Sequence, residues 1–279
     1  MKRWVVYLAL AGAAGCAGLR VKYNAKMSLH SPYTDSNGYL DSWRLLRDAS
    51  VISKGGSSGA HLVSSGKGSA GGITSTNPLR MKEWKVSFEI EVKNPGSIGF
   101  WVSDKNIAAE KELFGGENVF RGVMGFLSYG KTSVTSAEPS GGLCLGGSPG
   151  TFVVKEKRRI AMKNTFIVVL QYLNSTFSMQ YGTSPESLEE IGKVDVFLHP
   201  NYYLSIIGVS SESGAAEENA IVVKNITSSY LSTIKKKKFE EEKRSRSSYV
   251  WVIFLVLIVV ICYYLYQQKR LVKNKKILD

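Results

Sequence analysis

The sequence is poor in cysteine. Its three cysteines lie in three different parts of the chain, so no two of them are expected to form a disulfide within one folded domain. Cys16 stands in an apolar N-terminal run, Cys144 near the middle of the chain, and Cys262 in a second apolar run near the C-terminus. A disulfide-stapled fold is therefore excluded, and stability must come from a hydrophobic core. Cys144 is either buried or available to pair with another chain.

Histidine is also scarce, and its positions do not suggest a metal centre. His30, His61 and His199 are the three histidines, and they lack the spacing of metal ligands. No pair of carboxylates stands in the strand context of a glycosidase. These residues therefore indicate neither a metal centre nor a glycosidase pair.

Two uncharged runs mark the ends of the chain. Residues 4–18 follow a basic start and end in "GCAG", the small residues that a signal peptidase accepts, so residues 1–18 are predicted to be a cleaved signal peptide. A retained signal anchor is the alternative. Residues 249–266, "YVWVIFLVLIVVICYYLY", predict a transmembrane helix over 249–267. A buried core helix is disfavoured there, because the flanks are basic and the run has no amphipathic stripe.

Signal and stop-transfer runs together predict a single-pass type I membrane protein. Its parts would be a lumenal domain over residues 19–231, a charged stalk over 232–248 and a cytosolic tail over 268–279. Basic residues flank the apolar run on both sides, so the cleaved signal rather than the positive-inside rule sets this orientation.

The net charge of +13 is concentrated outside the predicted domain. Residues 235–246 carry seven Lys or Arg against three Glu, and residues 269–279 carry five against Asp279. These runs are typical of membrane flanks that face lipid head groups. The charge therefore does not indicate a nucleic-acid partner.

Between the ends, the pattern predicts β-strands. "KVSFEIEV" (85–92) alternates apolar and polar residues, as expected for a sheet with one wet face. Further predicted strands are "SIGFWVS", "FIVVLQYL", "TFSMQYG", "KVDVFLH", "YYLSIIGVS" and "AIVVKNITSSYL". The predicted fold is one all-β antiparallel sandwich, with surface loops and hairpins over the Gly/Ser-rich residues 54–72.

The string "GFLSYGKT" (125–132) matches the phosphate-binding loop G-x-x-x-x-G-K-[ST]. That loop must lead into a helix, whose N-terminus binds the phosphates. The residues after Thr132 contain two prolines and five glycines up to Gly150, so no helix is expected there. The string is interpreted as a strand, and no nucleotide partner is expected.

The string "GGSPG" (146–150) matches the nucleophile elbow of hydrolases, and Asp195 and His199 follow Ser148 in the hydrolase order. The elbow also needs a strand, a sharp turn and a helix. Asp195 and His199 are predicted to share one face of a strand, and nothing places Ser148 beside them. A hydrolase is therefore the weaker reading, and the chain is not expected to be an enzyme.

Two sequons predict N-glycosylation. Asn174 begins "NST" and Asn225 begins "NIT". Both fit the predicted lumenal location.

A series of blocks resembles the lumenal domain of the L-type (legume-like) lectins, the cargo receptors that cycle between the endoplasmic reticulum and the Golgi. The blocks are "SLHSPYTD" (28–35), Trp43, "GGITSTNPLRMKEWKVSFEIEV" (71–92), "IGFWVS" (98–103) and "FGGENVFRGVMGFLSY" (114–129). Gly71, Asn77, Pro78 and Trp84 keep the family's turn into a Trp-led strand, with Thr74 replacing an aromatic residue. Phe114, Gly115 and Gly122 keep the next block. The resemblance covers residues 23–231 and implies a legume-lectin-like jelly roll.

In that family, calcium held by acidic and amide side chains supports binding of high-mannose glycans. The corresponding run here is Ser128, Gly130 and Thr132, which lacks the acid, the aromatic residue and the Asn. The sugar-contacting Asp corresponds to Gly96–Ile98, and residues 133–150 have no counterpart of the calcium-linked His and Asp. Only Gly214, in the loop that lines the family's sugar pocket, is retained. Without an anionic ligand calcium would bind weakly, so no cofactor is expected.

The resemblance implies a cargo receptor of the endoplasmic reticulum and Golgi membrane that binds glycoprotein or protein cargo in the lumen. The alternative is a structural or partner-binding membrane subunit that keeps the lectin fold without carbohydrate binding. The tail ends in "KNKKILD", with Lys275 and Lys276 one place off the family's coat-protein retrieval signal. Coat proteins are therefore an open partner, and an ordinary basic tail is the alternative.

Overall fold

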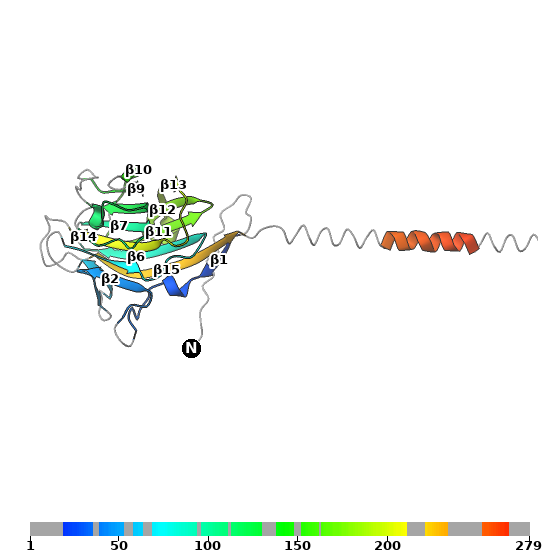
Figure 1. Cartoon of the computed structure of the whole chain (residues 1–279), viewed down its shortest axis with the longest axis horizontal. Helices are drawn as coiled ribbons and strands as arrows, with labels where there is room; N and C mark the ends of the chain where they lie inside the picture. Colours follow the sequence, from blue (N-terminus) through cyan, green and yellow to red (C-terminus); the bar gives the residue numbers. More distant parts are fainter. Residues whose placement is uncertain are drawn as a thin grey trace, which may run out of the picture. The chain divides into compact units, whose positions relative to one another are not determined.

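Within the described residues, fifteen β-strands form two antiparallel sheets (Figure 1). The computed structural model describes residues 19–35, 39–52, 58–63, 69–93, 96–110, 113–129, 138–147, 152–161, 163–210, 221–233 and 253–267. The strands belong to one unit that spans Val21–Ser232. The predicted all-β sandwich is confirmed.

The eight-stranded sheet has the order β13-β12-β11-β6-β15-β4-β3, with β1 paired to β15. Its strands are β1 (Leu19–Tyr23), β3 (Ser50–Ile52), β4 (Gly59–Val63), β6 (Trp84–Val92), β11 (Thr165–Leu173), β12 (Thr176–Gly182), β13 (Glu189–Asp195) and β15 (Ile221–Thr233). Strand β15 thus continues two residues into the predicted stalk.

The seven-stranded sheet has the order β10-β9-β8-β7-β14-β5-β2. Its strands are β2 (Trp43–Arg47), β5 (Ala70–Ser75), β7 (Gly96–Ser103), β8 (Gly122–Ser128), β9 (Ser140–Gly146), β10 (Phe152–Arg159) and β14 (Tyr203–Ser210). Three short 3-10 helices complete the unit: η1 (Ala25–Met27), η2 (Leu113–Gly115) and η3 (Pro185–Ser187).

The main core lies between the two sheets. Strand β6 buries every second residue, from Trp84 to Val92, as its period-2 pattern predicts. Phe88 of this strand meets Phe100 of β7 with ring centroids 5.3 Å apart. Burying a side chain of this size contributes about 1.5–3 kcal/mol, so the sandwich needs no disulfide.

A second cluster of buried apolar residues, which we call the outer cluster, covers the other face of the seven-stranded sheet. Its members are Trp101, Ile107, Ala109, Leu113, Phe114, Phe120, Met124, Phe126, Cys144 and Ile207. The segment between β7 and β8, which includes η2, supplies the covering side chains. The inner and outer faces of this sheet are therefore both buried over much of their area, which is why β7 is buried along its whole length.

Several glycine-rich strands correct the sequence prediction. Residues 54–72 were expected to be surface loops and hairpins, but β4 and β5 within this range are buried strands. Strand β9, "SGGLCLG", was not predicted at all. Residues 53–57 and 64–68 lie outside the described residues. These strands were missed because glycine weakens strand propensity, whereas here it permits close packing.

The predicted strand "KVDVFLH" (193–199) lies closer to the N-terminus than expected, as β13 over Glu189–Asp195. Strand β13 ends at Asp195, and residues 196–199 are irregular. His199 therefore does not share a strand face with Asp195. The other predicted strands from "SIGFWVS" to "AIVVKNITSSYL" are confirmed as β7, β11, β12, β14 and β15.

Residues 253–267 form a helix within the predicted transmembrane run. Among the residues that the structure describes, no helix is long and apolar enough to cross a membrane. The predicted signal peptide, most of the stalk and the tail lie outside the described residues. The membrane span therefore stays a prediction.

Candidate functional site

Three serines form a row across one end of the seven-stranded sheet. Ser97 of β7 pairs with Ser128 of β8, and Ser128 pairs in turn with Ser140 of β9. Each serine shares strand parity with a member of the outer cluster, so all three lie on the outer face. We call Ser97, Ser128 and Ser140 the hydroxyl row.

The hydroxyl row is buried, and its members differ in their contacts. The Ser97 hydroxyl donates to Ser128 Oγ at 3.1 Å. Ser140 Oγ is buried and has no hydrogen-bond partner among the described residues, which costs free energy unless another group meets it. Strand β10 continues the row with Arg159, which pairs with Ser140. The exposed Arg159 Nε lies 3.6 Å from Glu138 Oε2, a contact that solvent weakens.

The described part of this end does not fit a calcium site. Calcium is held by six to eight oxygens that include carboxylates, and the hydroxyl row supplies none. Within the described ranges, no group of three or more His, Cys, Asp or Glu side chains could hold a metal ion. Ser128 is placed as expected at the end of β8, but Gly130, Thr132 and Gly214 lie outside the described residues. The loss of the calcium and sugar sites therefore stays a prediction.

The outer cluster occupies the middle of the same face. Phe114 stacks on Phe126 with ring centroids 4.3 Å apart and an interplanar angle of 13°. Phe114 has a φ of 46° and Gly115 a φ of 91°, which turn the chain back over the sheet. The block "FGGENVF" thus serves to cover the outer face.

Cys144 lies inside the outer cluster and is fully buried. Burial disfavours the thiolate and raises the pKa of the Cys144 thiol to about 12. Of the two states left open by the sequence, the buried one is therefore observed.

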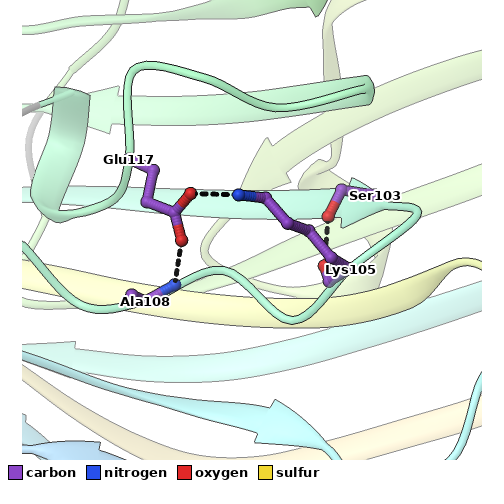
Figure 2. Close-up of polar contacts among 4 residues, drawn as sticks. All are labelled: Ser103, Lys105, Ala108 and Glu117. Carbon is purple, nitrogen blue, oxygen red and sulfur yellow. Dashed lines mark hydrogen bonds and ion pairs between the residues drawn. The ribbon is translucent and has the colours of Figure 1, made fainter.

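At the opposite end of the face, Glu117 joins two parts of the segment between β7 and β8 (Figure 2). Its Oε1 accepts a hydrogen bond from the Ala108 backbone nitrogen at 3.0 Å, and its Oε2 pairs with the Lys105 ammonium. The Ser103 hydroxyl, at the end of β7, donates to the carbonyl oxygen of Lys105. This end is therefore held by charge, whereas the hydroxyl row is neutral.

A pocket of about 590 Å³ opens at this charged end. It is lined by Asp104, Lys105, Val119, Phe120, Arg121, Gly146 and Gly147. Burial and the nearby Asp104 carboxylate raise the pKa of Tyr202, while Arg121 acts in the opposite direction. The pocket is therefore lined by acidic and basic side chains and by the aromatic ring of Phe120.

Sequence reasoning missed this pocket, although the signal was present. Asp104 directly follows the predicted strand "SIGFWVS", and Arg121 directly precedes "GVMGFLS". Antiparallel pairing of β7 with β8 brings the end of one beside the start of the other. The Asp104 backbone nitrogen donates to the Arg121 carbonyl oxygen at 3.2 Å.

The two sequons have different surroundings. Asn174 is exposed in the tight turn between β11 and β12, with a φ of 51°. Asn225 is half-buried on β15, and its side-chain nitrogen donates to Glu89 Oε2 at 2.5 Å. His30 Nδ1 lies 3.2 Å from the Asn225 Oδ1. Asn174 therefore has room for a glycan, whereas a glycan on Asn225 would replace a hydrogen bond to Glu89.

The strings that suggested other chemistry are placed as follows. "GFLSYGKT" begins as strand β8, and residues 130–137 lie outside the described residues before β9 starts at Ser140. Asp195 Oδ1 accepts from the Thr176 hydroxyl at 2.7 Å, and Ser148 is outside the described residues. His61 is buried on β4. The described residues assemble neither a phosphate loop nor a hydrolase triad.

No protein-family model and no curated protein matches the sequence. Solved structures do match the fold. The VIP36 exoplasmic/lumenal domain in its Ca²⁺- and mannose-bound form has a TM-score of 0.61 and 15% identity, over 74% of this chain and 90% of that chain. The legume lectin-like domain from Entamoeba histolytica has a TM-score of 0.60 and 13% identity, over 75% of this chain and 99% of that chain.

The metal-free Emp46p carbohydrate recognition domain matches similarly, with a TM-score of 0.58 and 16% identity over 75% of this chain and 98% of that chain. At these identities the likeness concerns the fold. The chain therefore has the fold of the L-type, legume-like lectin domains, as the sequence blocks had indicated.

Proposed function

We propose that the chain is a lectin-like receptor that binds glycoprotein or protein cargo without calcium in the lumen of the early secretory pathway. It acts as a binding protein and not as an enzyme. The observation that carries the proposal is the L-type lectin fold with a row of hydroxyls at the sheet end where the resemblance expects acidic ligands.

A calcium-free mode follows from the chemistry of this end. Hydroxyl groups donate and accept hydrogen bonds, as sugar hydroxyls and backbone amides do, and they need no ion to neutralise them. The neighbouring Arg159 adds a donor fork at the rim. Recognition there would rest on hydrogen bonds and shape.

The test is retention of the full chain, purified in detergent, on immobilised mannose and on a glycan array, with calcium and with a chelator. We expect the same retention in both conditions. Retention that the chelator abolishes would contradict the calcium-free mode and would place metal ligands in the loops outside the described residues.

The second candidate is a partner-binding membrane subunit that keeps the fold without sugar recognition. The burial of the hydroxyl row favours it, since a sugar must reach the groups that it bonds. This candidate predicts no retention on any glycan, with calcium or with the chelator. Near-ultraviolet circular dichroism would check that the chain tested has a folded core.

The proposed topology and route have separate tests. A type I orientation places Asn174 in the lumen, so a glycosidase-sensitive shift in mass should disappear in N174Q and persist in N225Q. Residues 268–279 grafted onto a surface reporter should hold it in the endoplasmic reticulum and Golgi. A reporter that reaches the plasma membrane would remove the support for coat-protein binding by the tail.

A further inference from the structure

Strand β10 forms an exposed edge of the seven-stranded sheet. It is the outermost strand of the seven-stranded sheet, and its only partner in that sheet is β9. It has 8 residues, whereas β2, at the other edge of the same sheet, has 5. Proteins usually keep such edges short or covered, because their free backbone groups pair with other strands.

The free side of β10 is open to a partner. All residues from Val153 to Arg159 are exposed. Over the described part of the chain, no backbone hydrogen bond joins β10 to a strand other than β9. A second strand could therefore add to this edge, as in the recognition mode called β-augmentation.

The charge of the edge selects among partners. Lys155, Lys157, Arg158 and Arg159 give the strand four cations, and Glu156 is its single acid. Glu156 lies against Gly192 of β13, where its Oε2 is 2.8 Å from the position that a Cβ of Gly192 would take. The acid is thus turned toward the other sheet, and the outward edge is left basic.

Of these four cations, Arg159 has an acidic neighbour within the described residues, the exposed Glu138, whose Oε2 lies 3.6 Å from the Arg159 Nε. Among the described residues, neither Lys155 nor Lys157 forms an ion pair. Arg158 Nη1 donates to the backbone carbonyl of Glu190 at 2.6 Å, which orients its guanidinium without neutralising it. The strand register shifts between Val154 and Glu156, so Lys155 occupies a bulge. Like charges and a bulge oppose pairing with a second copy of β10.

A pocket of about 210 Å³ lies at the C-terminal end of this strand. Arg158, Arg159 and Lys163 contribute to its wall, together with the hydroxyl-bearing Tyr181 and Ser187. Glu189 and Glu190 also line it, and Glu190 lies 4.0 Å from Lys193. The Tyr181 hydroxyl already donates to the Ala161 carbonyl oxygen and the Ser187 hydroxyl to that of Ser184. An acidic side chain of a partner strand would therefore meet the cations of this pocket.

We infer that β10 is a docking edge for an extended acidic polypeptide segment, which adds as a further strand and places a carboxylate in the pocket at Arg158, Arg159 and Lys163. The exposed Val153 and Val154 supply an apolar contact at the other end of the strand. The edge adjoins the hydroxyl row at Arg159, which pairs with Ser140, but the addition of a strand requires no sugar. The inference therefore extends the proposed receptor function to polypeptide cargo and does not depend on sugar binding.

The test is fluorescence anisotropy of the full chain, in detergent, with a labelled decapeptide of alternating Glu and Val. We expect saturable binding, and binding at least about tenfold weaker for the same peptide N-methylated at alternate residues along one edge, because strand addition needs those N–H groups. The matching Lys-Val decapeptide should not bind.

The matched protein variants are K155E/K157E on β10 and R44E/R47E on β2, the opposite edge of the same sheet. The first should weaken binding at least about tenfold, and the second should leave it within about twofold. If the N-methylated peptide bound as tightly as the unmethylated one, or if R44E/R47E weakened binding as much as K155E/K157E, the binding would be explained by general electrostatic attraction. Either result would overturn the inference.

Two further outcomes would also overturn it. Sedimentation of a dimer that K155E/K157E dissolves would assign the edge to a second copy of this chain. Binding to anionic phosphatidylserine vesicles, in competition with the peptide and stronger than it, would assign the basic edge to lipid. Mannose retention is expected to be unchanged in K155E/K157E, so failure of either proposal can be told from failure of the other.

Discussion

The two ends of the outer face of the seven-stranded sheet are built from opposite chemistry. At one end, Ser97, Ser128 and Ser140 are neutral and buried. At the other, Glu117 and Lys105 form an ion pair beside an open pocket that also holds Asp104. The outer cluster separates them. The same sheet therefore presents a sealed polar end and an open charged end.

The two ends differ in how a ligand could reach them: the groups of the charged end line an open pocket, whereas the hydroxyls of the other end are buried. Buried hydroxyls meet their needs within the protein or remain unpaired at a cost. Charged side chains at a strand end stay hydrated and remain available. The charged pocket lies at the end opposite to that where the resemblance expects calcium and sugar.

The strongest test of this comparison removes the cluster that separates the two ends. Phe126→Ala should lower the free energy of unfolding by about 3–5 kcal/mol, because it deletes a fully buried ring that stacks on Phe114. Chemical denaturation of the full chain measures the effect. Phe126→Leu, which keeps most of the volume, should cost much less; equal stability of F126A and the unaltered chain would mean that the cluster does not support the sheet.

The charged end is tested through Glu117. Glu117→Ala should cost about 2 kcal/mol, since it removes the acceptor for the Ala108 N–H and the partner of Lys105. Glu117→Gln keeps an acceptor and should cost about half as much. Salt near 1 M should reduce the difference in free energy of unfolding between the unaltered chain and Glu117→Gln, because it screens the partly exposed ion pair. A difference that salt leaves unchanged would indicate a packing effect instead.

The sealed middle of the face is tested by pH. The pKa of Cys144 is raised from 9.0 to about 12, so between these values the folded chain holds a proton that the unfolded chain has lost. Stability should therefore fall as pH rises from about 9 to about 12, by about 1 kcal/mol per pH unit. Burial also raises the pKa of Tyr129, which adds to the same alkaline loss.

Cys144→Ala measures the contribution of the thiol. In this variant the free energy of unfolding should fall less steeply with rising pH, and the remaining decrease should come from the tyrosine. Native Cys144 should also resist alkylation by iodoacetamide at pH 8 until denaturant is added. Rapid labelling of the native chain would show that the outer cluster opens to solvent.

The smallest effects are expected within the hydroxyl row. Ser128→Ala should cost about 1 kcal/mol, because Ser97 then donates to no acceptor at that position. Ser140→Ala should be neutral or slightly stabilising, because its hydroxyl has no hydrogen-bond partner to lose within the described part of the chain. A Ser140→Ala cost as large as that of Ser128→Ala would reveal a partner for Ser140.

The sequence predicted much of the sandwich and little of the site. Strands β6, β11 and β12 follow from alternation or from runs of branched and aromatic residues, which record their burial locally. Ser128 could be placed at a strand end from the family blocks. The pocket at Asp104 and Arg121 could not be assembled without knowing that β7 pairs with β8, because pairing joins residues distant in sequence.

By itself, the sequence determined the fold class, the absence of an intrachain disulfide in the domain and the order of most strands. Only the tertiary structure decided that "AGGITS" and "SGGLCLG" are largely buried strands inside the sheet and not at its edge. A Cβ on Gly71 would lie 2.2 Å from the Leu62 carbonyl oxygen, and one on Gly142 would lie 2.2 Å from that of Glu156. The need for glycine arises from neighbours that are distant in sequence, so local propensity assigns these residues to loops while close packing makes them strands.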